Sequence, residues 1–338
     1  MVKKNFRVRI MPSVLFIYKN TNLANQFTKH FKLNGYDVYE FYDEEIPYYE
    51  FSTLQRLENI YHRLVKKDTQ HIHTINHRNF IKLTNKKLNQ LTKQNLKFDF
   101  CFVVRGDLVQ ENVLHYARSI SDKMIDYQLD GLSVSAKVLD YDKLFDQIYV
   151  FDEQDVKDYP SYNLKAITNC YFEEANEIHK TIDFSYIGVN TEDRFELLEQ
   201  LYLILKKINK AYKIQFNLKQ DEFHPCNSDK LIMLDESVTY QQSLELSNQS
   251  KVLIDLKRNE HNGLSLRFFE AMNYHNKIIT NNSTVKNYNF YHPNNIFITD
   301  FTNFDGLEEF INLPYHKLAE EITNQYNFKY WINRIFNL

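Results

Sequence analysis

Cysteine, glycine and proline are scarce in this chain, and long uncharged stretches are missing. Its 338 residues include three cysteines, six glycines and six prolines. Cys101, Cys170 and Cys226 lie far apart and form no Cys-x-x-Cys pair, so neither a zinc site nor a disulfide framework is indicated. So few cysteines fit a reducing compartment. No uncharged run approaches the roughly 20 residues that a membrane-spanning helix needs.

Other absences narrow the class of protein. No Gly-x-Gly-x-x-Gly follows the first apolar segment, which disfavours a dehydrogenase or an epimerase-like sheet protein that binds a dinucleotide. The basic first 20 residues hold a short apolar run without a small-residue cleavage site, so they predict a strand rather than a signal peptide. Linkers rich in glycine, proline or serine, internal repeats and low-complexity tracts are not evident. We therefore expect a globular chain.

Apolar and aromatic residues are plentiful. Hydrophobic residues make up 43% of the chain, with 26 Phe and 24 Tyr, which is ample for packed cores. The length exceeds one ordinary core and predicts two domains. The alternation of strand-like and helix-like segments starts anew near residues 160–180, which predicts one domain over 1–170 and a second over 171–338. In such tandem sheets, ligands bind at the carboxyl ends of the strands.

Strand-like and helix-like segments alternate almost throughout, which predicts two parallel, doubly wound α/β sheets. The expected strands are 13–19, 37–43, 98–104, 123–128, 147–151, 181–188, 211–217, 230–234, 251–256 and 277–280. The expected helices are 22–34, 51–67, 77–96, 110–120, 135–144, 192–208, 238–248, 264–274, 305–312 and 315–336.

The net charge of −3 hides a basic region over residues 51–97, in which only Glu58 and Asp68 are acidic. Three interpretations stay open: two solvated helix faces, a surface for anionic membrane lipid or polysaccharide, and RNA binding. Glycine-bracketed aromatic motifs for base stacking are absent, so nucleic acid is the least favoured partner. Histidines 71, 73 and 77 are not accompanied by a cysteine or acidic residue in a pattern typical of metal ligands, which favours loop histidines over metal ligands.

The segment from His261 to Thr280 carries the strongest indication of a site. Asn262 and Gly263 stand between a predicted strand and a predicted helix, where a glycine lets the backbone approach a ligand. The N-terminus of that helix suits a phosphate. Cationic or donor groups in the same loop are Lys257, Arg258 and His261.

Glu270 lies two turns into this predicted helix, within an otherwise apolar stretch. A carboxylate there can accept two hydrogen bonds from a vicinal diol such as a ribose. The plain alternative is that Gly263 makes a turn and Glu270 is solvated. The phenylalanines around Glu270 argue against exposure, and a buried carboxylate needs a partner.

The stretch NGLSLRFFEAMNYHNKIITNN resembles the glycine loop and the E-A-[ML] helix of two-domain GT-B glycosyltransferases. The wider likeness is to the group loosely related to the spore-coat protein CgeB and to lipopolysaccharide and capsule biosynthesis transferases. Further segments agree in order from about residue 98: FDFCFVVRGDLVQENV, LFDQIYVFDEQDVKDY, DFSYIGVNTEDR, NNSTVKNYNFYHPNNIFITD and YWINRIF.

The resemblance implies roles for individual residues. Glu270 would bind the nucleotide ribose, and Gly188 would let the first loop of the second domain approach the donor. Backbone or hydroxyl groups offered to the diphosphate would come from Gly263, Leu264 and Ser265. Arg267 matches an arginine that contacts phosphates or ties helix to loop. Related retaining enzymes often carry a second glutamate where this chain has Asn262, which leaves the stereochemical outcome open.

Transfer of an activated sugar requires groups that stabilise the departing diphosphate and, in an inverting enzyme, a general base. Basic side chains and a helix terminus would stabilise the departing diphosphate, so neither a metal nor another cofactor is expected. The one Asp-x-Asp triplet, Asp140 to Asp142, falls inside a predicted helix. An inverting enzyme also needs a general base, and the candidates are Asp107 and Asp130, which are otherwise turn or capping aspartates. Arg105 would pair with either acid or touch the acceptor.

These expectations combine into a function. The chain would be a metal-independent glycosyltransferase that moves a sugar from a nucleotide-sugar to a cell-surface glycan, such as lipopolysaccharide or capsule. Domain 1–170 would face a glycan or lipid-linked acceptor and domain 171–338 would hold the donor, with the last helix crossing back. The expected place is the cytoplasm or the inner face of the membrane, reached through the basic helices of 51–97. The alternative is an inactive GT-B-like protein that holds a glycan or nucleotide.

Overall fold

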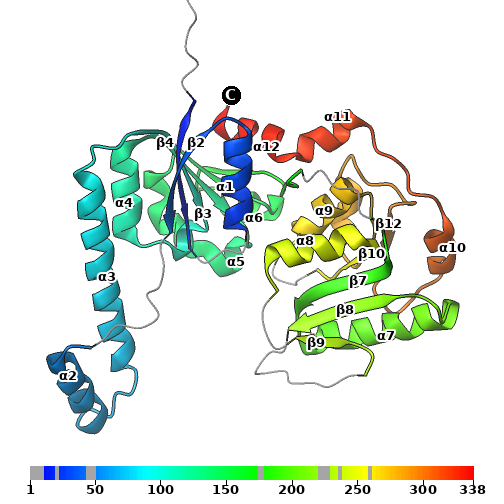
Figure 1. The fold of residues 1–338 in the computed structure, drawn as a ribbon, viewed down its shortest axis with the longest axis horizontal. Coiled ribbons are helices and arrows are strands. Elements are labelled where there is room, and N and C mark those ends of the chain that lie inside the picture. The colour runs from blue at the N-terminus through cyan, green and yellow to red at the C-terminus, as the bar shows by residue number, and fades with distance from the viewer. Residues whose placement is uncertain are drawn as a thin grey trace, which may run out of the picture. The chain divides into compact units, whose positions relative to one another are not determined.

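The computed structural model describes residues 11–19, 23–42, 51–173, 179–219, 229–234, 238–257 and 261–338. The chain forms two six-stranded sheets with helices around them (Figure 1). Strand order is β2-β1-β3-β4-β5-β6 in the first sheet and β12-β11-β10-β7-β8-β9 in the second. Neighbouring strands run parallel, for example β1 beside β3 and β10 beside β7. The prediction of two doubly wound α/β sheets is confirmed.

The first sheet follows the predicted strands closely. Its strands are β1 (Ser13–Tyr18), β2 (Asp37–Tyr42), β3 (Phe98–Val104), β4 (Ser121–Gln128), β5 (Gln147–Val150) and β6 (Leu164–Ala166). The helices along this part of the chain are α1 (Ala24–Leu33), α2 (Thr53–Leu64), α3 (His71–Thr92), α4 (Glu111–Ile120), α5 (Leu132–Ser135) and α6 (Glu153–Asp158), with 3₁₀ turns η1 (Gly106–Leu108) and η2 (Ala136–Leu144).

The second sheet is built in the same way. Its strands are β7 (Ile182–Val189), β8 (Ile214–Lys219), β9 (Ile232–Leu234), β10 (Ser250–Asp255), β11 (Lys277–Thr280) and β12 (Ile296–Ile298). Its helices are α7 (Glu192–Ile208), α8 (Tyr240–Gln249), α9 (Leu266–Tyr274), α10 (Leu307–Asn312), α11 (Glu320–Thr323) and α12 (Phe328–Phe336), with 3₁₀ turns η3 (Ser283–Asn287) and η4 (Asn324–Tyr326).

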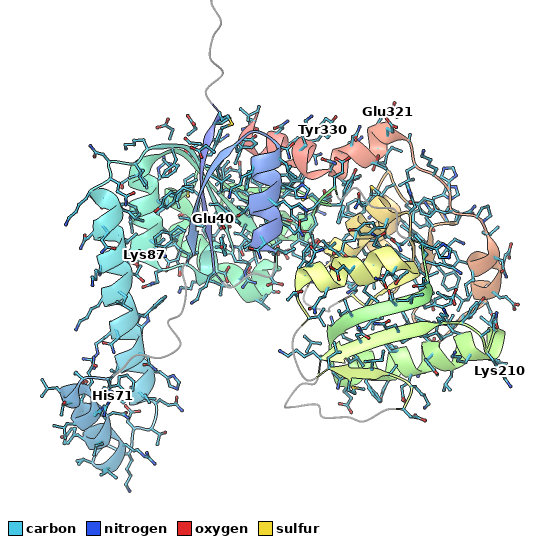
Figure 2. All side chains as sticks on the ribbon, viewed as in Figure 1. Glu40, His71, Lys87, Lys210, Glu321 and Tyr330 are labelled. Carbon is cyan, nitrogen blue, oxygen red and sulfur yellow. The ribbon has the colours of Figure 1, made fainter. Side chains whose placement is uncertain are left out.

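The apolar pattern of each segment explains which face is buried. In β3, FDFCFVV, every residue except Asp99 is buried, as expected for a central parallel strand with helices on both faces. On α7, the buried leucines are Leu198, Leu201 and Leu205, spaced three and four residues apart. They pack with Phe184 and Phe216 of the second sheet. Figure 2 shows the side chains of the described residues on this fold.

Two predicted helices are wrong in detail. A regular helix was expected over 135–144, but Ala136–Leu144 form the 3₁₀ turn η2, so Asp140 and Asp142 lie in that turn. The expected tail helix 315–336 breaks at Asn327, whose backbone is extended and whose side chain accepts a hydrogen bond from the Lys329 N–H. An asparagine that caps a new helix cannot continue the preceding one. The short strands β6 and β12 were not predicted.

Residue contacts divide the described chain into two compact units. One comprises residues up to Ala24, then Phe31–Gln128 and Ser135–Ile148. The other comprises Asn25–His30, Leu129–Val134 and the described part of Tyr149–Leu338. No helix in the described ranges combines the length and apolarity needed to cross a lipid bilayer.

Each sheet has one point where the strand order reverses. The chain leaves β1 towards β2 on one side and later adds β3 on the other. In the second sheet, β8 lies on one side of β7 and β10 on the other. Loops that leave neighbouring strands in opposite directions open a crevice at their carboxyl ends, which is where open α/β sheets bind ligands.

Candidate functional site

A pocket of about 260 Å³ lies at the reversal point of the second sheet. It is formed by the carboxyl ends of β7 and β10 and by the loop that leads into α9. The residues around it are Tyr186, Ile187, Gly188, Val189, Arg194, Asp255, Leu256, Lys257, His261, Gly263, Ser265, Arg267 and Asn282. We call this the β7–β10 pocket. Six of the ten predicted donor-binding residues line it.

The pocket is rich in positive charge. Arg194, Lys257 and Arg267 line it, with His261 beside them and Asp255 as the one acid among its described lining residues. The N-terminus of α9 also faces this loop, because Ser265 is the residue that precedes the helix. The first N–H groups of a helix have no partner within the helix and carry a partial positive charge. The combination suits an anion such as a diphosphate.

Arg267 is held in place by three contacts. Its Nη2 donates to the backbone carbonyl of Ile187 at 2.7 Å, and its guanidinium lies 5.3 Å from the centre of the Tyr186 ring. Its Nη1 lies 3.6 Å from Oδ1 of Asp255. The resemblance allowed either a phosphate contact or a tie from helix to loop. The structure shows the tie, from α9 to β7 and β10.

Asp255 ends β10 and is almost fully buried. Its Oδ1 accepts a hydrogen bond from Ser265 Oγ at 2.6 Å, and its Oδ2 accepts one from Thr280 Oγ1 at 2.9 Å. Together with Arg267 these donors satisfy a buried carboxylate, which would otherwise be costly. Asp255 therefore fixes the start of α9 relative to β10 and β11. The hydroxyl of Ser265, expected to meet a diphosphate, is used in this network.

At both glycines of the pocket, neighbouring protein atoms leave no room for a side chain. A Cβ on Gly188 would lie 2.4 Å from Oη of Tyr186. A Cβ on Gly263 would lie 2.5 Å from ring carbons of Phe151 and 2.8 Å from its carbonyl oxygen. Contacts under 3 Å are not tolerated in packed structures, so a side chain at 263 would displace backbone. Both residues line the pocket, and their approach to a donor stays a prediction.

The loop before Gly263 is cross-linked by polar contacts. Lys257 Nζ donates to Oδ1 of Asn262 at 2.7 Å, and the Asn262 N–H donates to Oδ2 of Asp152. The ring of His261 meets Phe151 edge to face at 4.9 Å. Asn262 therefore positions Lys257 from just outside the pocket. The predicted donor residue Arg258 lies outside the described residues.

Leu264 and Glu270 are the two predicted donor residues in described positions that point elsewhere. Leu264 is buried in the apolar cluster around α9, and its carbonyl accepts from Asn169 Nδ2 at 2.9 Å. Glu270 is buried, and its Oε2 accepts from Ser247 Oγ at 3.1 Å. Burial raises the pKa of this carboxyl above its ordinary value, against the opposing charge of Arg267. Its contact with a ribose stays a prediction.

Comparison of the sequence with protein-family models gives no match, and neither does comparison with curated protein sequences. Solved structures do match over nearly the whole length. An α-glucosyltransferase in complex with UDP and DNA shares 14% identity with a TM-score of 0.54, covering 96% of this chain and 93% of that one. A UDP-forming trehalose-phosphate synthase from Burkholderia xenovorans shares 11% at 0.53, covering 97% and 98%.

A third match is the N-terminal domain of a trehalose-6-phosphate phosphatase from Candida albicans, with 8% identity, a TM-score of 0.57, and coverage of 98% and 97%. At such identities the likeness establishes the fold and leaves the activity to be argued from the site. The chain has the GT-B fold. The fold class expected from the sequence is thereby confirmed, whereas the CgeB-like group within it is not.

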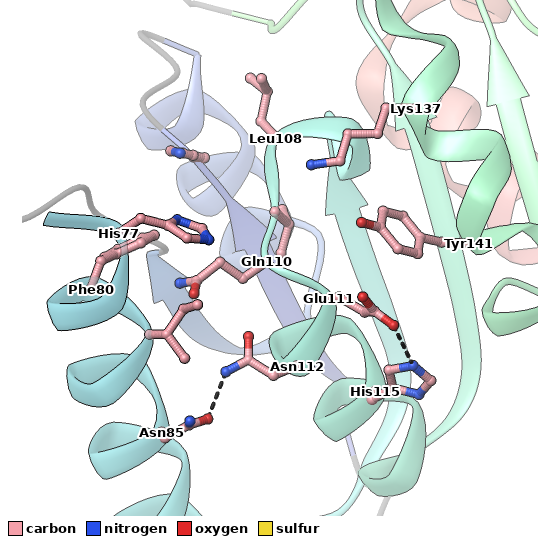
Figure 3. A pocket seen from close by; sticks show the side chains of 13 residues that line it. His77, Phe80, Asn85, Leu108, Gln110, Glu111, Asn112, His115, Lys137 and Tyr141 are labelled. Atoms are coloured by element: carbon pink, nitrogen blue, oxygen red, sulfur yellow. Dashed lines mark hydrogen bonds and ion pairs between the residues drawn. The ribbon is translucent and has the colours of Figure 1, made fainter. Parts of the chain in front are cut away.

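The first GT-B sheet has a pocket at its own reversal point. It measures about 530 Å³ and is lined by Lys19 after β1, by Leu108 and Val109 after β3, and by parts of α3, α4 and η2 (Figure 3). Its remaining lining residues are His77, Phe80, Ile81, Asn85, Gln110, Glu111, Asn112, His115, Lys137 and Tyr141. We call this the β1–β3 pocket. Sequence reasoning missed it because its residues come from four separate stretches of the chain.

Two predicted residues of the first half, Arg105 and Asp107, come just before the lining residue Leu108 in the sequence. Arg105 and Asp107 form a two-pronged ion pair, with Nε to Oδ1 and Nη2 to Oδ2 both at 2.8 Å. Arg105 adopts a left-handed backbone (φ 61°), a conformation that costs a non-glycine residue energy. Both oxygens of Asp107 are therefore engaged. Asp130 follows β4 directly and is half-buried.

The expectation that His71, His73 and His77 are loop histidines without acidic partners is wrong: all three lie in α3, and His71 has an acidic partner. Folding brings Glu58 of α2 to 2.9 Å from His71 Nε2, with His62 also close by. One ligand atom from each of these three lies within 4.8 Å of the others. The two imidazole rings stack at 3.4 Å, and Arg78 donates to the same oxygen of Glu58. Arg78 competes with any metal ion for that oxygen, so the group acts as a tie between α2 and α3.

Proposed function

We propose that this GT-B protein is a glycosyltransferase that uses a nucleotide-sugar donor. The observation that carries the proposal is the β7–β10 pocket at the reversal point of the sheet, which is lined by Arg194, Lys257 and Arg267 and by the loop that leads into α9. An arrangement of this kind binds the diphosphate of a nucleotide-sugar and stabilises the charge that develops as the diphosphate leaves. Basic side chains supply this stabilisation without a metal ion.

The nucleotide is proposed to be a uridine diphosphate. One of the compared structures contains UDP, and another is named a UDP-forming synthase. These titles support UDP as the first candidate to test. In this proposal the ribose hydroxyls approach Glu270, and the sugar lies towards Asn262, where the chain lacks the second carboxylate of related retaining enzymes.

The acceptor is proposed to be a glycan that carries negative charge, as cell-surface polysaccharides often do. The support is the β1–β3 pocket, which combines the amines of Lys19 and Lys137 with the aromatic side chains of Phe80 and Tyr141 (Figure 3). Aromatic faces pack against sugar rings, and amines attract carboxylate or phosphate groups. A lipopolysaccharide or capsule precursor has this chemistry.

The general base is proposed to be Asp130 and not Asp107. Proton transfer to Asp107 would require it to give up one of its two contacts with Arg105. Asp130 lies two residues after the carboxyl end of β4 and is half-buried, so its side chain is partly open to solvent. In a transferase that inverts configuration, the base removes the proton of the acceptor hydroxyl.

The first experiment is a thermal-shift and calorimetric titration with UDP, GDP, CMP and dTDP. A nucleotide that binds only the folded chain raises its melting temperature by mass action. The double variant Arg194→Gln with Lys257→Gln should lose roughly tenfold or more in affinity, because charge-assisted hydrogen bonds are removed. The matched control is Lys207→Gln, an exposed lysine on α7. Unchanged affinity in the double variant, or no nucleotide bound by the wild type, would contradict the proposal.

An inactive GT-B-like binding protein is the second candidate, favoured by Asn262 in place of an acidic residue. The two candidates differ in turnover. Incubation with a panel of UDP-sugars, read as release of UDP, should show slow hydrolysis by a transferase even without its acceptor. Binding of UDP with no release from any sugar, with or without glycan acceptors, would favour the binding protein.

A further inference from the structure

Helix α2 is attached to the protein by its polar side and turns its apolar side to solvent. The ordinary surface helix of a globular protein does the opposite. None of the residues of α2 is buried. Figure 1 shows α2 at the far end of α3, away from the strands of the first sheet.

The attachment of α2 to α3 is a set of polar contacts. Gln55 Nε2 donates to Oδ1 of Asn79 at 2.6 Å, and Glu58 accepts from His71 and Arg78. A capping box at Ser52 and Gln55 begins the helix. Figure 2 labels His71 at this junction. These ties fix which face of α2 looks outward.

The outward face is apolar. Its exposed fractions run from 51% for Ile60 and Tyr61 to 79% for Leu54, and the face consists of Leu54, Leu57, Ile60, Tyr61, Leu64 and Val65. These six make up a large share of the 16 large hydrophobic side chains that are exposed in the described residues. A contiguous exposed apolar patch on a soluble protein marks a surface that something else covers.

The apolar face has a basic margin. Arg56 and Arg63 lie on α2, and Lys66 and Lys67 follow its last turn, all exposed. Lys66 Nζ lies 6.0 Å from the centre of the Tyr61 ring, so an amine stands at the edge of the apolar face. Long basic side chains beside apolar ones reach the headgroups of anionic lipids while the apolar groups enter the acyl boundary.

We infer that the α2 face binds the interface of an anionic lipid membrane. The basic margin decides between the possible occupants. A second copy of this chain would bring two cationic margins together, whereas an anionic bilayer attracts the same margin and accepts the apolar face. The helix would lie in the plane of the surface without spanning the bilayer.

The test uses the full chain and vesicles of phosphatidylcholine, either alone or mixed with phosphatidylglycerol. We expect sedimentation with the mixed vesicles only, and weaker binding at high salt. Leu57→Ser with Leu64→Ser should reduce binding about tenfold. Arg63→Gln with Lys67→Gln should reduce it about fivefold per charge. The control is Leu203→Ser on α7, where an exposed leucine (54%, against 58% for Leu57) is removed from a different surface.

Direct insertion is read from Tyr61→Trp. The one native tryptophan, Trp331, is fully buried and provides a constant background. The new tryptophan should shift its emission to shorter wavelength on mixed vesicles and be quenched by brominated lipids. Equal binding by wild type and Leu57→Ser with Leu64→Ser would overturn the inference. A second result would also overturn it: the wild type forms dimers in light scattering, Leu57→Ser with Leu64→Ser is monomeric, and neither binds vesicles. The α2 face would then bind a second copy of the chain.

Discussion

The N–H of Gly106 donates a 2.8 Å hydrogen bond to Oδ1 of Asp126, and nothing larger than a hydrogen fits between the two residues. A Cβ at position 106 would lie 2.5 Å from that oxygen. The contact joins the turn after β3 to the end of β4. It therefore holds the turn that carries Arg105 and Asp107 against β4, the strand that leads to Asp130.

We expect Gly106→Ala to destabilise the protein. Asp126 is fully buried and held by Gln128 Nε2 at 2.9 Å, so it has little room to move aside. Overpacking of this kind costs about 1–3 kcal/mol. The free energy of unfolding by urea measures it, and a double-mutant cycle with Asp126→Ala isolates the clash. Additive losses in the cycle would show that the strain lies in the backbone and not at Asp126.

The stability of the protein should fall as pH rises through the neutral range because of Asp126. Burial raises the pKa of Asp126 from 3.8 to about 8, against the opposing hydrogen bond from Gly106. A carboxyl that keeps its proton longer in the folded chain stabilises it fully below pH 3.8, and this contribution is lost as pH rises towards 8. Each unit of pKa difference corresponds to about 1.4 kcal/mol.

Asp126→Asn should remove most of this dependence. Oε1 of Gln128 is buried and has no hydrogen-bond partner as placed, so a turned amide would accept from the protonated carboxyl or from the Asn side chain. Urea unfolding of wild type and variant across pH 4 to 9 gives the comparison. The Asn variant should overtake the wild type at high pH. Parallel curves would mean that Asp126 stays ionised when buried.

Strands and helices were read from the sequence because apolar residues repeat with the periods of buried elements. The helix 192–208 and the strands of Phe98–Val104 and Lys277–Thr280 appear where their patterns placed them. This pattern cannot reveal contacts between residues that are far apart in the sequence. Position 263 has no room for a side chain because of Phe151, which lies more than a hundred residues earlier in the chain.

The site was predicted in part for the same reason. Gly188, Lys257 and Arg267 follow strand ends or open a helix, which the sequence shows. Arg194 was not predicted, because it sits in the first turn of α7, six residues after Gly188, and an arginine at that place has no distinguishing pattern in the sequence. Asp255 ends a strand like many aspartates, and only the fold reveals that Ser265 and Thr280 converge on it.

Gly263→Ala separates the packing role of this glycine from a role in binding. The new methyl group would meet the ring and the carbonyl oxygen of Phe151, so the loop before α9 must shift. We expect a loss of about 1–3 kcal/mol in the free energy of unfolding and weaker binding of UDP. Phe151→Ala combined with Gly263→Ala should recover only part of both, since the carbonyl remains. A stable variant with unchanged UDP affinity would show that the loop is free to adjust.

Lys277→Met should destabilise the second sheet. Lys277 is buried in β11, and its Nζ donates to the carbonyl oxygens of Phe310, Ile311 and Leu313 at the end of α10. Methionine keeps the length of the stem but leaves these carbonyls unsatisfied, which costs about 1–3 kcal/mol. The matched control is Lys251→Met, which breaks an exposed ion pair with Asp183 and should cost under about 1 kcal/mol. Equal losses in urea unfolding would contradict the assignment.

Glu270 can be tested for its two roles with one pair of ligands. As a buried acceptor it serves Ser247, so Glu270→Ala should lower the free energy of unfolding by about 1–3 kcal/mol. Glu270→Gln keeps an acceptor oxygen and should lose less. If the carboxylate also contacts the ribose, Glu270→Gln weakens binding of UDP but leaves that of 2′,3′-dideoxy-UDP unchanged.

The control for that comparison is Ser247→Ala, which removes a donor to Glu270 while leaving the carboxylate in place. It should affect unfolding without discriminating between the two nucleotides. Equal losses of UDP and dideoxy-UDP in Glu270→Gln would assign the residue to packing alone, because a carboxylate that never meets the ribose cannot sense its hydroxyls. The diphosphate would then be held by Arg194, Lys257 and the N-terminus of α9, with the ribose recognised by another group of the β7–β10 pocket.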